Sequence, residues 1–159
     1  EQGRIINASG RHQLIHAERG AGDSSIIHGL VDSNIAGASS AVSVLMLLIK
    51  QMQDAVLVFH HAKLDIKFLQ KVALEHFRCP LLFPYLDTMI IEKHRSSLQG
   101  KTFGLRLAQC RQRYGLPSST QHNALADAQA TAELLLAQAS YIGRPHNLKL
   151  SDLSLRCTG

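Results

Sequence analysis

The sequence lacks the patterns that mark secreted, membrane-spanning and disordered proteins. Its three cysteines, at positions 79, 110 and 157, are odd in number and widely spaced, which fits neither a disulfide framework nor a paired-cysteine zinc site. The longest apolar run, residues 44–49, ends at Lys50 and is far shorter than the roughly 20 residues that a membrane-spanning helix needs. The opening residues do not resemble a secretory leader, so the expected location is the cytoplasm.

No repeat, low-complexity run or proline- and glycine-rich linker divides the chain. Its 159 residues, 45% of them hydrophobic and 18% charged, are typical of one folded domain. We expect this domain to cover residues 1–142. Residues 143–159 are then a tail whose leucines dock on the core or contact a partner.

Hydrophobic periodicity predicts alternating strands and helices, and therefore an α/β layered fold. The run at 55–59 predicts a strand buried on both faces, because it is short, continuous and rich in β-branched residues. Shorter strands are expected at 4–6, 13–17 and about 81–86. Helices are expected at 42–52 with Ser39 or Ser40 as N-cap, at 64–76, from 88 to 93, at 101–114 before Gly115, and at 124–139.

Acidic residues are absent from a long stretch of the chain. The sequence has 17 Lys and Arg against 12 Asp and Glu, a net charge of +5, and no acid between Lys93 and Ala126. Positive charge concentrated in this way suits the binding of a polyanion. The alternative is a solvated helix face with a basic loop, which binds no ligand. The residues expected to form a nucleic-acid patch are Lys101, Arg106, Arg111 and Arg113.

Two aspartates are expected in the first turns of helices. Asp65 follows the strand at 55–59, and the carboxyl end of a parallel strand faces the ligand crevice of an α/β sheet. Asp127 follows a polar loop that contains His122. A single aspartate at such a position more often favours the helix dipole than binds a metal ion, so neither aspartate alone indicates a site.

Residues 60–69 and 122–131 resemble two motifs of the DnaQ-like exonucleases, the DEDDh group. The second family motif reads approximately His-Asn-Ala-x-Phe-Asp-x-x-Phe-Leu, which residues 60–69 match with His61 for Asn and Leu64 for Phe. The third reads His-x-Ala-x-x-Asp-Ala-x-Ala-Thr, which residues 122–131 match throughout. Weaker matches at 27–30 and 86–88 follow the family order, so the resemblance covers about residues 1–140.

The resemblance implies an RNase H-like fold, with a mixed central sheet flanked by helices, and a 3′–5′ exonuclease that releases nucleoside 5′-monophosphates. It implies that Asp65 and Asp127 bind Mg²⁺ or Mn²⁺, two ions in the complete site, and that His122 is the general base. The residues that it implies for substrate contact are His28, His60 and Leu64. Hard divalent ions prefer carboxylate oxygens, and a histidine accepts a proton near neutral pH.

The first family motif, Asp-x-Glu, does not occur in the 159 residues. By comparison with the family we expect the sequence to begin inside the second strand and to lack the central first strand. That segment would supply two further carboxylates. We therefore expect these residues alone to be weakly active or inactive, and a longer parent protein to be an exonuclease.

Several alternatives stay open at this point. An exonuclease-like module that has lost catalysis would bind nucleic acid or a protein partner, although the presence of His122 and Asp127 favours an enzyme. His60 and His61 suggest zinc, but no further ligand lies at suitable spacing. Asp87 is expected to cap the following helix, and Cys79 and Cys110 to be buried thiols. The sequence does not decide whether the substrate is DNA or RNA, or whether a polymerase or a second copy of the chain is a partner.

Overall fold

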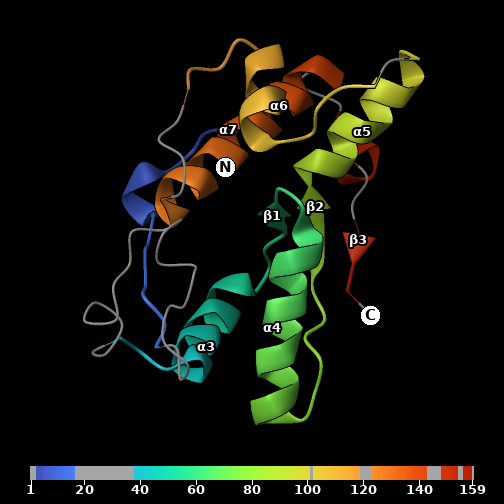
Figure 1. Ribbon diagram of the computed structural model, residues 1–159. Helices are drawn as coiled ribbons and strands as arrows, with labels where there is room; N and C mark the ends of the chain where they lie inside the picture. The colour runs from blue at the N-terminus through green and yellow to red at the C-terminus, as the bar shows by residue number, and fades with distance from the viewer. Residues whose placement is uncertain are drawn as a thin grey trace.

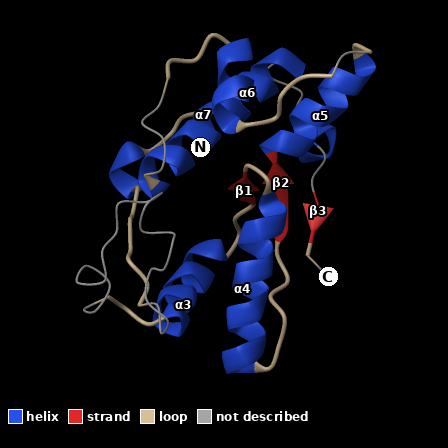
Figure 2. Ribbon diagram, in the orientation of Figure 1, coloured by secondary structure: helices blue, strands red, loops and turns tan. Residues whose placement is uncertain are grey.

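The structure is a computed structural model that describes residues 3–16, 38–100, 102–118, 123–142, 148–153 and 156–158. A small mixed sheet lies between helices, as Figures 1 and 2 show. Strand β1 (Leu57–Phe59) pairs in parallel with β2 (Pro84–Asp87), and β2 pairs antiparallel with β3 (Arg156–Cys157). This arrangement is the α/β, RNase H-like fold expected from the sequence.

Most of the expected helices are present. The helices of the described residues are α3 (Ala41–Met52), α4 (Ala62–Phe77), α5 (Thr88–Leu98), α6 (Leu107–Arg113) and α7 (Ala124–Ile142), with the short 3-10 helices η1 (Asn7–Ser9) and η2 (Leu150–Leu153). Ser40 caps α3 by accepting a hydrogen bond from the Ser43 N–H. The helix expected at 101–114 begins only at Leu107, and Gly115 follows it with a φ of 67°, the left-handed conformation that glycine adopts without strain.

The strands expected near the start of the chain are wrong. Residues 4–6 are not a strand, because the Ser9 N–H and hydroxyl both donate to the Ile6 carbonyl and close a turn. Of residues 13–16, only Ile15 forms an isolated bridge, to Ser39, and position 17 lies outside the described residues.

Strand β1 differs from the expected fully buried strand. Its three residues are half-buried, and β2 is its one partner strand within the described residues. Its aromatic residue Phe59 still packs, with ring centroids 6.1 Å from Tyr85 and 6.5 Å from Phe83. The strand expected at 81–86 begins at Pro84, which suits the first position of a strand because proline lacks an N–H to donate.

The predicted tail belongs to the core where it is described. Leu153 is buried in a cluster with Leu86 and Ile91, and Leu148 packs against that cluster. Strand β3 then borders β2, and the Thr158 hydroxyl donates to the Leu81 carbonyl at 2.8 Å. Leu148 and Leu153 thus dock on the protein itself, whereas Leu150 is 47% exposed.

No helix among the described residues is long and apolar enough to cross a membrane. Of the two cysteines expected to be buried, Cys110 is fully buried and Cys79 is exposed. Burial raises the pKa of the Cys110 thiol to about 11.

Candidate functional site

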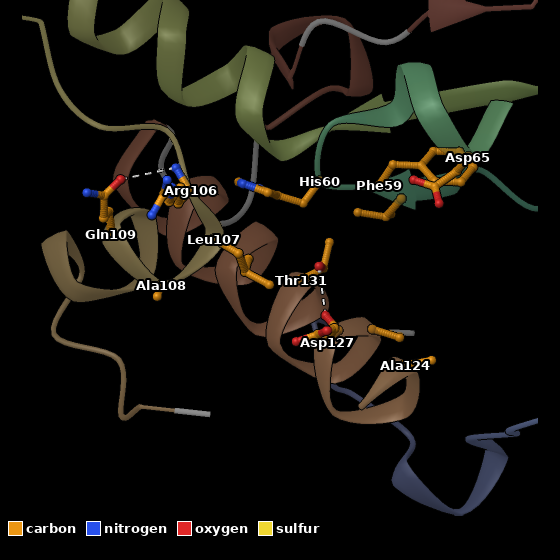
Figure 3. Close-up of a pocket in the computed structure, with 12 residues that line it drawn as sticks. Phe59, His60, Asp65, Arg106, Leu107, Ala108, Gln109, Ala124, Asp127 and Thr131 are labelled. Atoms are coloured by element: carbon orange, nitrogen blue, oxygen red, sulfur yellow. Dashed lines mark hydrogen bonds between the residues drawn. The ribbon is translucent and has the colours of Figure 1, made fainter. Parts of the chain in front are cut away.

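A pocket of about 800 Å³ opens where the carboxyl end of β1 meets α4, α6 and α7. Figure 3 shows side chains entering it from these elements, with Asp65 on α4 and Asp127 on α7. Its described lining residues are Val58, Phe59, His60, Asp65, Arg106, Leu107, Ala108, Gln109, Ala124, Asp127, Ala128 and Thr131. The structure therefore brings together the two aspartates that the sequence singled out, from helices that begin 62 residues apart.

Asp65 stands in the first turn of α4, as predicted. The pKa of its carboxyl is raised, first because partial burial disfavours the charged form and also because Asp87 carries a like charge. A backbone hydrogen bond and the neighbouring His61 oppose this shift. A partly buried carboxylate is favourable only where a bound cation or a proton compensates its negative charge.

Asp127 stands in the first turn of α7, and that helix begins with a cap. The Asn123 side chain accepts hydrogen bonds from the N–H groups of Leu125 and Ala126. The Thr131 hydroxyl donates to the Asp127 backbone carbonyl at 2.8 Å, so this bond leaves the Asp127 carboxylate available to the pocket. The two aspartates provide oxygen ligands, but no group of three or more potential metal ligands gathers among the described residues.

The turn between β1 and α4 depends on Asp87 as well as on its own residues. His61 has a φ of 71°, in the left-handed region where both Asn and His are enriched, so His at the family's Asn position is compatible with the turn. The Asp87 carboxylate accepts hydrogen bonds from the N–H groups of His61 at 3.0 Å and Ala62 at 2.9 Å. It also accepts one from Met89 at 2.9 Å, which confirms the predicted cap of α5.

His60 contacts the protein on both sides of its ring. Its Nδ1 lies 2.8 Å from the Thr88 hydroxyl, and its Nε2 lies 2.8 Å from the Leu105 carbonyl oxygen. Because a carbonyl only accepts, Nε2 carries the donated proton. Burial is the main cause of a lowered pKa for this histidine. His60 lines the pocket, but its two ring nitrogens hold the wall in place, which also removes the basis for a zinc site here.

The expected basic patch is only partly correct. Arg106 is exposed and lines the pocket. Arg111 is 3% exposed, donates to the Ala130 and Pro117 carbonyls, and lies 2.8 Å from Glu133, so its place in a surface patch is wrong.

Arg113 is also largely engaged inside the protein. Its Nε donates to Glu92 at 2.8 Å, and its guanidinium lies 5.2 Å from the centroid of the Phe103 ring. Glu92 is 1% exposed and compensates this charge. Arg113 therefore holds α6 against α5 and does not extend the basic surface that the sequence suggested.

The remaining sequence-predicted residues stand apart from the pocket or lie outside the described residues. Leu64 is 65% exposed on the outer side of α4 and does not line the pocket. His28, Lys101 and His122 lie outside the described residues. Sequence reasoning missed Phe59, Thr131 and Gln109 as pocket residues. Phe59 could have been found from its position at the end of a strand. Thr131 could have been found from its position one helical turn after Asp127.

The comparisons with known proteins agree with this arrangement. A family model described as Exonuclease, RNase T, matches residues 13–135. The chain is 30% identical over 118 residues, 72% of its length, to a protein of Mycobacterium tuberculosis named as a bifunctional exonuclease/endonuclease. It is 31% identical over 118 residues, 71% of its length, to a DNA polymerase III subunit epsilon-like protein of Rhodobacter capsulatus.

These matches cover 18% and 16% of the two relatives, so the chain spans less than a fifth of either one. The family model, in contrast, covers both the strand–helix segment that carries Asp65 and the helix that carries Asp127. The motif resemblance, the pocket and the family match therefore concern the same residues. The chain belongs to the exonuclease family that this model describes, the DnaQ-like group.

Proposed function

We propose that the protein is a metal-dependent 3′–5′ exonuclease that hydrolyses terminal phosphodiester bonds of DNA or RNA and releases nucleoside 5′-monophosphates. The observation that carries the proposal is the position of Asp65 and Asp127, which enter one pocket from two helices. Both stand at motif positions of a family whose model matches the chain. A pocket of about 800 Å³ also suits a nucleotide-sized ligand.

The donor set fits a hard divalent ion. Mg²⁺ and Mn²⁺ prefer oxygen ligands, and Mg²⁺ is commonly held by one or two carboxylates while water and substrate phosphate complete its shell. Asp65 and Asp127 would supply these carboxylates. Asp87 would not, because its carboxylate already accepts three backbone hydrogen bonds. When bound, such an ion supplies positive charge to the phosphoryl oxygens and lowers the pKa of a coordinated water.

The protein's own side chains would orient the substrate. Arg106 places an exposed cation at the pocket wall, where it suits a phosphate. Phe59 offers an apolar surface at the end of β1 against which a base would pack. We assign His122 the role of general base and His28 a contact with the terminal nucleotide by their motif positions alone. The chemistry of a histidine suits proton transfer near neutral pH.

The test is a nuclease assay of the longer parent protein, because the first family motif is absent from these 159 residues. The substrates are oligonucleotides labelled at the 5′ end, in DNA and RNA form, with Mg²⁺, with Mn²⁺ or with EDTA. We expect progressive shortening from the 3′ end, release of 5′-monophosphates, and loss of both in EDTA. Asp65→Asn and Asp127→Asn should abolish turnover, whereas Asp152→Asn, a carboxylate outside the pocket, should not. His122→Ala should lower the rate by on the order of 10² to 10⁴.

The same assay separates the proposal from its alternative. A protein that binds the oligonucleotides but releases no mononucleotide with any metal is a catalytically impaired binding module, and the enzyme proposal then fails. Cleavage inside a circular single strand, which has no 3′ end, would show an endonuclease and contradict the 3′–5′ assignment.

A further inference from the structure

Within the part of the chain that the structure describes, helix α4 leaves one side uncovered as it leads away from the pocket. Its inner side packs on α3 and β1 and buries Ala62, Val72 and Ala73. Its outer side carries four exposed residues in the first two turns, which we call the α4 face: Lys63, Leu64, Lys67 and Phe68.

The α4 face combines large apolar groups with cations. Leu64 is 65% exposed and Phe68 is 49% exposed, unusual values for such side chains at successive turns of one helix. Lys63 and Lys67 lie four residues apart and are therefore neighbours, about 6 Å apart along the helix axis. Lys71 continues the row, and it lies 3.8 Å from Glu75 in an exposed pair.

The α4 face is continuous with the pocket. Phe68 follows Asp65 by three residues and so lies on the next turn beside it, since positions i and i+3 are neighbours on a helix. Leu64 precedes Asp65 directly. On a helix of 3.6 residues per turn, the order around α4 runs from Asp65 through the apolar pair to the two lysines. A ligand that leaves the pocket past Asp65 would therefore meet Phe68 and then the positive charges.

We propose that the α4 face binds the single-stranded nucleic acid that leads out of the pocket. Phe68 stacks on a base one or more nucleotides from the chain end, and Lys63 and Lys67 pair with the backbone phosphates. This combination of an aromatic platform and cations is the chemistry by which proteins hold single strands without reading their sequence. The proposal rests on the proposed function, because the pocket supplies the end of the strand.

Charge favours this occupant over a second copy of the chain. The α4 face is apolar and cationic and carries no acid, so two copies facing one another through it would oppose like charges. The other cations that the sequence suggested, Arg111 and Arg113, are engaged inside the protein, so the exposed lysines of α4 are better placed to receive phosphates.

The test measures binding of fluorescent single-stranded oligonucleotides, DNA and RNA in separate arms, by anisotropy in EDTA at several salt concentrations. Lys63→Gln/Lys67→Gln should make the slope of log affinity against log salt less negative by about 1.4, because each phosphate contact on a single strand contributes about 0.7. The control Lys93→Gln/Lys149→Gln removes the same charge from exposed lysines elsewhere and should leave the slope unchanged. An equal slope for both double variants would overturn the proposal.

Phe68→Ala tests the stacking platform and should weaken binding about 5- to 150-fold. Leu74→Ala, which removes another exposed apolar side chain from the same helix, is its control. Thermal melting of each variant checks the fold. A dimer in light scattering that Phe68→Ala disperses would assign the face to a second copy and contradict the proposal.

Hydrolysis of an aryl ester of a nucleoside 5′-monophosphate, which has no second nucleotide to reach the α4 face, tests the proposed function alone. A wild-type protein that hydrolyses neither this ester nor oligonucleotides contradicts the exonuclease proposal. Wild-type affinity for long strands in the lysine and Phe68 variants contradicts the α4 proposal.

Discussion

The carboxylate of Asp87 accepts a hydrogen bond of 2.9 Å from the backbone N–H of Ala62, which ties the end of β2 to the start of α4. The same carboxylate caps α5 through Met89. A side chain that is 4% exposed thus holds the first turns of two helices, and one of them carries Asp65. The position of one proposed metal ligand depends on an acid that is itself not a ligand.

Asp87→Ala should therefore lower the free energy of unfolding by about 3 kcal/mol, because it removes a cap and leaves buried N–H groups without a partner. It should also reduce nuclease turnover by displacing Asp65. Urea unfolding and the nuclease assay measure the two effects. Asp152→Ala is the control, because the Asp152 carboxylate caps a single exposed N–H, that of Lys149, and should cost about 1 kcal/mol or less.

Removing the charge of Arg111 and of Arg106 should have opposite consequences. Arg111→Gln should cost about 3–5 kcal/mol of stability, because it leaves Glu133 without its ion-pair partner and removes the donor of two carbonyls. Arg106→Gln should leave stability nearly unchanged and weaken nucleic-acid binding. Denaturant unfolding measures the effect on stability, and the salt dependence of oligonucleotide binding measures the effect on binding. If Arg111→Gln changed the salt slope of the folded protein, Arg111 would belong to the binding surface after all.

Glu92 should control the stability of the three helices that it joins. It lies 2.8 Å from both Arg113 Nε and the Tyr114 hydroxyl and 3.2 Å from Gln138. Although burial alone would raise its pKa, these hydrogen bonds lower the pKa of Glu92 below its ordinary value of 4.5. Its stabilising effect is therefore complete above pH 4.5 and is lost as the pH falls toward the lower folded pKa.

Glu92→Gln should weaken this acid dependence, and Glu92→Ala should cost about 3–5 kcal/mol near neutral pH. Unfolding measured by circular dichroism between about pH 3 and 7 provides both numbers. Glu75→Gln, in an exposed pair with Lys71, is the matched control and should change stability little. Identical acid transitions in wild type and Glu92→Gln would contradict the assignment.

His60 should make stability fall as the pH drops below its ordinary pKa of 6.5. Burial lowers its folded pKa below the ordinary 6.5, so the unfolded chain takes up a proton first, and the contribution present above pH 6.5 is lost as the pH falls. His60→Gln should flatten this part of the stability curve relative to the wild type. A variant of the exposed His94, His94→Gln, should not; equal curves for wild type and His60→Gln would exclude the effect.

Local sequence signals predicted the parts of the fold that depend on local chemistry. The helix that begins at Ala62 and the one that begins at Ala124 follow from periodicity and propensity, and both aspartates fall in first turns as expected. The strand at residues 57–59 follows from its apolar run. Because the two motifs each fix one helix start, the sequence predicted the centre of the pocket.

The remaining features depend on contacts between distant segments. The cap from Asp87 to Ala62 joins residues 25 apart, and the neutralisation of Arg111 requires Glu133 on another helix. Neither partner carries a local signal, since an exposed cation and a buried, paired one look alike in sequence. The same reason explains why the acid-free stretch overestimated the basic surface. Residues 4–6 gave a strand-like pattern without a strand because the Ile6 carbonyl closes a turn with Ser9.

Thr158 has a consequence for the order in which the sheet can form. Its hydroxyl reaches the Leu81 carbonyl across 77 positions of sequence, and its N–H donates to Phe83. Loop closure over such a separation makes contacts of this kind late and slow in folding. Until residues 156–158 arrive, one edge of β2 offers unpaired backbone groups to any other extended chain. The protection of the pocket-bearing sheet from aggregation during synthesis thus depends on a short segment that contributes nothing to the pocket itself.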